Sequence, residues 1–182
     1  MASPSSSDAA VTAGSRPDPF ALLGLSARYD VDKATLEAAF FERSKALHAD
    51  RFAQAPAAER VAALSKSRAL NDAYQLLRRD ATRAEWLLAR EGVTIGDNER
   101  IEPALVMALL DEREALAEAR VAGDREGLDR MATSMRARRT AALAAVAAAF
   151  AVPDLAAVKQ QLILLRYVER YLEECDAALD EE

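Results

Sequence analysis

Residues 57–91, AAERVAALSKSRALNDAYQLLRRDATRAEWLLARE, contain neither glycine nor proline and are therefore free of the residues that most often interrupt a helix. Two more such stretches run from residue 128 to 152 and from residue 154 to the end. Alanine occupies 42 of the 182 positions, whereas isoleucine occurs only at positions 95, 101 and 163. Alanine favours helices and β-branched residues favour strands. The sequence therefore predicts an all-α protein of one or two compact domains.

Capping residues and helix breakers divide the chain into predicted helices. Aspartate stabilises a helix start through its side-chain oxygen, and proline fits the first helical position. In the first half we expect a short helix over 19–23 capped by Asp18, one over 33–47 capped by Asp32, a long one with Pro56 at its first position, and one capped by Asp80 that ends before Gly92. In the second half, helices open at Pro103, Asp124 and Asp154 and run to about residues 121, 150 and 179.

Short connections between these helices predict two packing units. The two long helices of the first half form an antiparallel hairpin, and the three helices of the second half form a bundle. Arg43 and Lys45 are expected to point away from the hairpin interface. The apolar positions expected on the long helix are Val61, Leu64, Ala69, Ala73, Leu76 and Leu77.

The two halves differ in charge. Residues 18–90 carry 12 Lys and Arg against 10 Asp and Glu, a balance of +2, whereas residues 91–182 carry 11 against 19, a balance of -8. Between them, Gly92 and Gly96 flank a turn-forming segment. We therefore divide the chain into a flexible tail (1–17), a first domain (18–92), a linker (93–99) and a three-helix bundle (100–182).

Several function classes are not supported. Cys175 is the only cysteine, which excludes a multi-cysteine metal or iron–sulfur site supplied by this chain alone and favours a reducing, cytoplasmic compartment. His48 is the only histidine and has no nearby nucleophile, so we expect neither catalysis nor a cofactor. The acidic chain lacks aromatic residues among its basic ones, which disfavours nucleic-acid binding. The longest apolar run, residues 141–153, is too short to cross a membrane.

Two helices of the second half are apolar around more of their circumference than one packing stripe requires. On the first of them, Leu105, Leu109 and Leu116 share one sector, while Val106 and Leu110 lie about 100° further round. The last helix shows the same excess over residues 162–172. Either the first domain covers this extra surface, or it binds a partner protein.

Spaced motifs in the first half resemble the J-domain of the HscB-type co-chaperone family, and a weaker resemblance continues at residues 107–114 and 165–167. The motifs are DPFALLGL at 18–25, Tyr29, HADRF at 48–52, NDAYQLL at 71–77 and RAEWLL at 83–88.

The resemblance implies an adaptor, not an enzyme. Its J-domain would dock on a DnaK/HscA-type chaperone and stimulate the chaperone's ATPase, and its bundle would hold an IscU-type iron–sulfur scaffold. The implied chaperone-binding residues are His48, Ala49, Asp50, Arg51, Arg43 and Lys45. The implied scaffold-binding residues are Val106, Met107, Leu110, Asp111, Glu114 and Tyr167.

One residue departs from the family's loop motif, which is His-Pro-Asp. Here Ala49 stands between His48 and Asp50. Proline would hold His48 extended, whereas alanine permits the preceding helix to run on into the loop. We therefore expect weakened ATPase stimulation; the alternative is an adaptor that binds chaperone or scaffold without stimulating ATP hydrolysis.

Overall fold

The computed structural model describes residues 17–96, 99 and 103–181, and the side chains of these residues except 49 and 103–106. Nearly all of the predicted tail and part of the predicted linker therefore lie outside the described residues. Within the described part, the chain forms seven α-helices, one 3₁₀ helix and no strand, which confirms the all-α prediction. The elements are α1 (Pro19–Leu23), α2 (Lys33–Ala46), η1 (Ala49–Phe52), α3 (Ala57–Arg78), α4 (Asp80–Arg90), α5 (Pro103–Ala122), α6 (Arg125–Ala151) and α7 (Leu155–Asp180).

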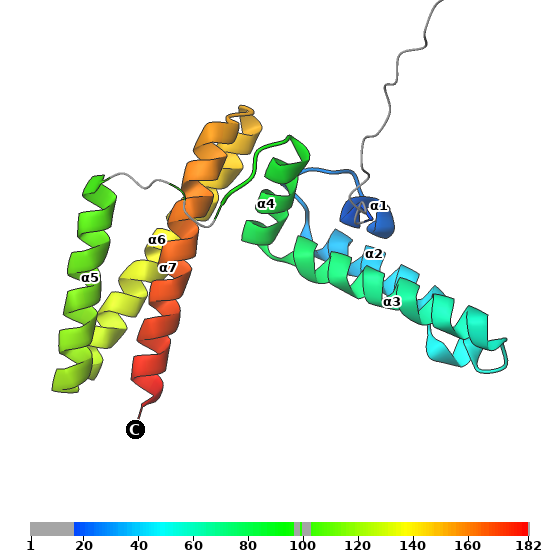
Figure 1. Ribbon diagram of the computed structural model, residues 1–182, viewed down its shortest axis with the longest axis horizontal. Helices are drawn as coiled ribbons and strands as arrows, with labels where there is room; N and C mark the ends of the chain where they lie inside the picture. Colours follow the sequence, from blue (N-terminus) through cyan, green and yellow to red (C-terminus); the bar gives the residue numbers. More distant parts are fainter. Residues whose placement is uncertain (1–16, 97–98, 100–102, 182) are drawn as a thin grey trace, which may run out of the picture.

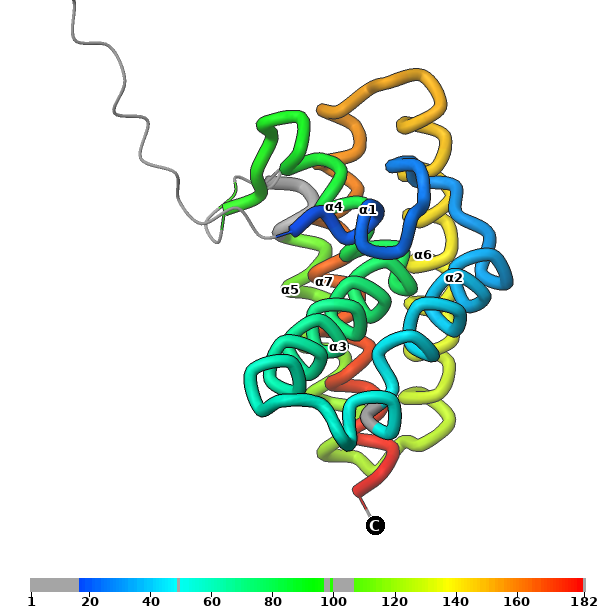
Figure 2. Tube along the Cα trace, turned by 90° about the vertical axis from the view of Figure 1, so that its right-hand side faces the viewer, coloured from blue at the N-terminus to red at the C-terminus, as the bar shows by residue number. Residues whose placement is uncertain are grey.

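The first half is built on the predicted antiparallel hairpin of α2 and α3, with α1 lying across it (Figure 2). Asp18 and Asp32 cap α1 and α2 as predicted, accepting hydrogen bonds from the backbone N–H groups of Phe20 and Thr35, both at 2.8 Å. Gly24 ends α1 in a left-handed conformation. The hairpin core consists of Phe20, Leu23, Leu36, Leu70, Ala73, Leu77 and Leu87.

The buried stripe of α3 differs from the predicted one. Ala73 and Leu77 are buried as expected, but Val61 and Leu64 are 64% and 72% exposed. The buried residues of α3 are Ala63, Leu70, Ala73 and Leu77. At 100° per residue, Val61 and Leu64 lie about 160° and about 100° from Ala63, away from this stripe. Their side chains therefore remain in water.

The starts of α3 and α4 also differ from the predictions. Pro56 is the N-cap of α3, one residue before the helix, and Asp80 is the first residue of α4 instead of its cap. The Asp80 carboxylate pairs with Arg83, which is 5% exposed. Arg83 also donates hydrogen bonds to the carbonyl oxygens of Tyr29 at 2.8 Å and Leu77 at 2.6 Å. Asp80 thus neutralises a buried cation.

The second half is the predicted bundle, in which α5 and α7 run in the same direction and α6 runs opposite (Figure 1). Asp124 and Asp154 cap α6 and α7 through the backbone N–H groups of Gly127 and Ala157, at 2.9 and 3.0 Å. Cys175 is fully buried in the core at the end of the bundle where α6 begins and α7 ends. That core consists of Leu116, Ala119, Leu128, Ala132, Met135, Val168, Tyr171, Leu172, Cys175 and Ala178.

Helix α4 lies between the hairpin and the bundle and contributes to both cores (Figure 1). Its Leu87 packs in the hairpin core, whereas Ala84 and Leu88 pack with residues of α6 and α7. Tyr29 stacks on Phe150 of α6, with ring centroids 4.9 Å apart. These shared apolar contacts hold the hairpin against the half of the bundle where α6 ends and α7 begins. The bundle residues in the shared core are Ala142, Val146, Ala149, Val158, Leu162 and Leu165.

Candidate functional site

The loop between α2 and α3 has an extended residue at the position that precedes the missing proline. α2 ends at Ala46, and the N–H of Leu47 donates to the carbonyl of Ser44 at 3.0 Å. His48 then adopts φ -60° and ψ 136°, and Ala49 begins η1. Alanine permits the helix to run on into the loop, but α2 does not do so, because the backbone of His48 is extended.

The polar side chains of this loop point into solvent. His48 and Arg51 are exposed, and the side chain of Asp50 is 90% exposed. The backbone N–H of Asp50 donates to Nδ1 of His48 at 3.4 Å, and the Asp50 carboxylate lies 3.3 Å from the same nitrogen. The side chain of Ala49 lies outside the described residues. The loop offers a ring, a carboxylate and a guanidinium for contact with another protein.

The two basic residues predicted on α2 differ in their surroundings. Lys45 is exposed and pairs with Glu42 at 2.7 Å, which lowers the pKa of that carboxyl. Arg43 is half-buried, and its guanidinium lies so close to Gly24 that a side chain there would collide with it. Arg43 also donates to the carbonyl of Ala39 at 3.4 Å. Arg43 thus partly packs under α1, so Lys45 and Arg51 are the more accessible cations.

The residues predicted to bind a scaffold lie at the surface of α5 and α7. Met107 is 59% exposed, Leu110 56% and Tyr167 38%, so the first domain does not cover them. It covers another part of the α7 circumference, where α4 packs against Leu162 and Leu165. The side chain of Val106 lies outside the described residues. The exposed members of the predicted set are Met107, Leu110, Asp111, Glu114 and Tyr167.

Ion pairs between α5 and α7 show the register of the two helices. Arg113 pairs with Glu174 at 2.6 Å, and Arg120 pairs with Glu181 about two helical turns further along. In both pairs the partners are 61 positions apart in the sequence. Because the helices run in the same direction, this offset places Tyr167 level with the start of α5. The sequence-predicted residues of the two helices therefore belong to one end of the bundle.

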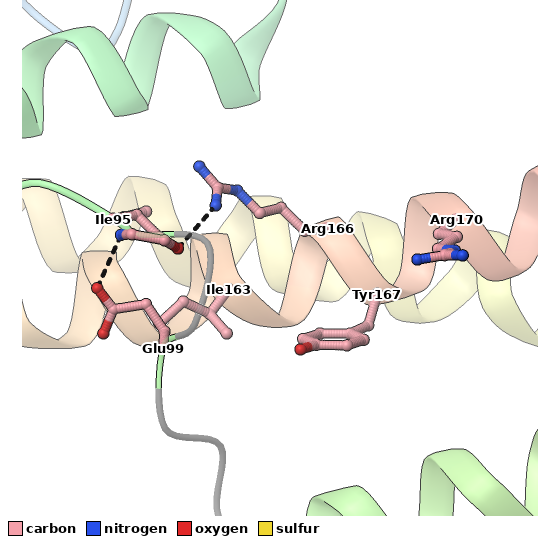
Figure 3. Close-up of a pocket in the computed structure, with 7 residues that line it drawn as sticks. Ile95, Glu99, Ile163, Arg166, Tyr167 and Arg170 are labelled. Atoms are coloured by element: carbon pink, nitrogen blue, oxygen red, sulfur yellow. Dashed lines mark hydrogen bonds between the residues drawn. The ribbon is translucent and has the colours of Figure 1, made fainter.

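A pocket of about 190 Å³ opens beside Tyr167, between α7 and the segment that leads to α5 (Figure 3). Glu99 closes one side, accepting hydrogen bonds from Lys159 at 2.8 Å and from the N–H of Gly96 at 2.9 Å, which lower its pKa. Arg166 donates to the carbonyl of Gly96 at 3.4 Å. The lining residues are Ile95, Gly96, Glu99, Ile163, Arg166, Tyr167 and Arg170.

Among these pocket residues, only Tyr167 was predicted from the sequence. Ile163 belongs to the last helix's apolar arc, which is wider than one packing stripe requires, so the sequence did contain a signal for Ile163. Arg166 also pairs with Glu85 of α4 at 3.0 Å, a contact between residues 81 positions apart. No local pattern predicts such a contact.

Comparison with known proteins identifies the family. The model of the HSCB C-terminal oligomerisation domain matches residues 101–176. A co-chaperone protein HscB homolog from Ralstonia nicotianae is 34% identical over 168 residues, which cover 89% of this chain and 96% of the relative. The chain belongs to the HscB co-chaperone family. Another HscB homolog, from Azoarcus, is 31% identical over 166 residues, covering 90% of this chain and 94% of that protein.

Solved HscB structures share the fold. The chaperone HscB from Vibrio cholerae superposes with a TM-score of 0.79 at 27% identity, covering 90% of this chain and 98% of that one. Human co-chaperone HscB gives a TM-score of 0.81 at 23% identity, covering 88% and 81%. These matches confirm a J-domain followed by a helical C-terminal domain. The HscB family model matches the second half, where the sequence motifs were weaker.

Neither a membrane-spanning helix nor a metal-binding cluster occurs among the described residues. No helix there is both long and apolar enough to cross a membrane. No group of three or more His, Cys, Asp and Glu side chains there is placed to hold a metal ion.

Proposed function

We propose that this HscB-family protein delivers an IscU-type iron–sulfur scaffold to a DnaK/HscA-type chaperone and stimulates the chaperone's ATPase. In this proposal residues 18–92 act as the J-domain, 93–99 as the linker and 100–182 as the scaffold-binding bundle. Relatives that align with nearly the whole chain are named co-chaperones. The observation that carries the proposal is that one chain exposes both the His48–Asp50 loop and the apolar face of Met107, Leu110 and Tyr167.

The loop geometry supports ATPase stimulation despite Ala49. A residue before proline is restricted to an extended backbone, with ψ of roughly 120° to 160°. His48 has ψ 136° without that proline. His48 and Asp50 therefore start in a conformation compatible with the family's loop, and alanine only leaves it less restrained. This favours a weakened stimulator over an adaptor that does not stimulate at all.

The apolar face supports binding of a protein scaffold. Met107 has a long unbranched side chain that adapts to irregular surfaces, and aromatic residues such as Tyr167 are enriched in the centres of interfaces. Exposed Asp111 and Glu114 on the same helix add a polar rim. A face of this kind suits a partner that brings apolar and basic side chains.

Two variants test the two activities separately. Asp50→Asn removes the exposed charge of the loop, so we expect most of the ATPase stimulation to be lost while scaffold affinity stays unchanged. Changing Met107, Leu110 and Tyr167 together to alanine should abolish scaffold binding and leave ATPase stimulation, because truncated interface anchors each cost on the order of 1 to 2 kcal/mol. Single-turnover ATP hydrolysis and calorimetric titration of the scaffold measure the two effects.

The far-ultraviolet circular dichroism of the triple variant is the control. The three side chains are already 38% to 59% exposed, so helicity should be retained. A wild-type protein that does not bind the scaffold, or that does not stimulate the chaperone, would contradict the proposal.

A further inference from the structure

The pocket beside Tyr167 is continuous with the proposed scaffold face, because Tyr167 belongs to both. Its volume of about 190 Å³ is smaller than the roughly 300 to 1,000 Å³ of small-molecule sites. Ile95, Ile163 and the Tyr167 ring supply apolar walls (Figure 3). The pocket therefore fits one aliphatic side chain of a protein better than a cofactor.

Three charged residues line this pocket, and two of them, Glu99 and Arg166, already pair with other residues of the protein. Glu99 is neutralised by Lys159 at 2.8 Å. Arg166 is held by Glu85 at 3.0 Å and by the carbonyl of Gly96. These contacts fix the pocket wall and leave little charge there for a partner.

Arg170 is the most exposed charged residue that lines the pocket. Its side chain is 71% exposed, and the ion pair described for it is a long one, 3.5 Å to Oε1 of Glu174. The same oxygen already accepts a hydrogen bond from Arg113 at 2.6 Å. A guanidinium binds carboxylates through several parallel N–H donors, so Arg170 can donate hydrogen bonds to a carboxylate of a partner protein.

We propose that this pocket, with Arg170 at its rim, is a second part of the scaffold interface and receives an aliphatic side chain flanked by a carboxylate. This inference rests on the proposed function, since the scaffold that covers Tyr167 also covers the pocket. The two parts of the interface carry opposite charge, acidic at Asp111 and Glu114 and basic at Arg170. Such polarity fixes how a partner is oriented on the face.

Charge reversal at Arg170 tests this inference in the full-length protein, with the IscU-type scaffold of the same organism as the probe. We expect Arg170→Glu to weaken scaffold binding by about three- to tenfold and Arg170→Gln by about two- to fivefold, with smaller differences at high salt. Arg130→Glu is the matched control, because Arg130 is 70% exposed, lies on α6 and does not line the pocket. It should change the affinity less than twofold.

The outcomes separate this inference from the proposed function. If the wild type binds the scaffold and the triple alanine variant does not, but Arg170→Glu binds as tightly as Arg130→Glu, the pocket lies outside the interface and the inference is overturned. If the wild type does not bind at all, the proposed function itself fails. Should Arg170→Glu lose helicity, Arg170→Gln decides, because it removes the charge without introducing a repulsion with Glu174.

Discussion

Replacing Ala49 by proline restores the family's loop motif at a position whose backbone already suits it. His48 lies in the extended region that a following proline imposes, and α2 has ended at Ala46. Ala49 is the first residue of η1, and the first residue of a helix needs no amide hydrogen for an intrahelical bond. Proline therefore fits without rebuilding the loop.

The expected gain follows from the restriction of the chain. A proline that fits the native backbone stabilises a protein by about 0.4 to 1 kcal/mol, chiefly by restricting the unfolded chain. If the same restriction orders the loop before it meets the chaperone, Ala49→Pro raises ATPase stimulation about two- to fivefold. In a chain of 182 residues, the thermal midpoint should rise by about 1 to 4 °C.

Single-turnover ATP hydrolysis by the organism's DnaK/HscA-type chaperone measures the effect, with the co-chaperone below saturation. Ala49→Gly is the matched variant, because glycine frees the same backbone position and should lower stimulation by a similar factor. A variant Ala49→Pro that is more thermostable but stimulates less would refute the reasoning about loop order. If neither the wild type nor Ala49→Pro stimulates ATP hydrolysis, the protein is instead an adaptor that binds chaperone or scaffold without stimulating the ATPase.

Three further predictions concern stability and association. Arg83→Leu should reduce the free energy of unfolding, measured in urea, by an amount near the lower end of roughly 3 to 5 kcal/mol. The variant leaves two carbonyl groups without their hydrogen-bond donor, while Asp80 keeps some contact with water. An unchanged urea midpoint would contradict this prediction. Burial raises the pKa of Cys175 to about 11 and of Tyr171 to about 12, from ordinary values of 9 and 10. Both groups are neutral in the folded protein and ionise earlier when unfolded, so stability should be full below pH 9 and fall between about pH 9 and 12, as a series of thermal melts would reveal. The rate of association with the chaperone should fall as salt increases, because Lys45 and Arg51 are exposed; a rate that ignores ionic strength would remove these cations from the encounter.

Local sequence signals define where most of the helices begin and end. Asp18, Asp32, Asp124 and Asp154 cap the helices predicted from them, because a cap satisfies N–H groups only two or three residues away. The exposure of Leu110 was one of two outcomes that the sequence left open, since an apolar arc wider than one packing stripe is covered either by the first domain or by a partner protein.

Which apolar and charged side chains are buried depends on how the helices pack. Val61 and Leu64 are exposed because α3 packs against its neighbours through the face that carries Ala63, Leu70 and Ala73, and the neighbouring elements determine which face that is. Arg83 is buried because its acceptors include a carbonyl 54 positions away in the sequence. The pocket beside Tyr167 likewise needs the segment before α5 folded onto α7. Capping depends on neighbours along the chain, whereas burial and pockets depend on which distant surfaces meet.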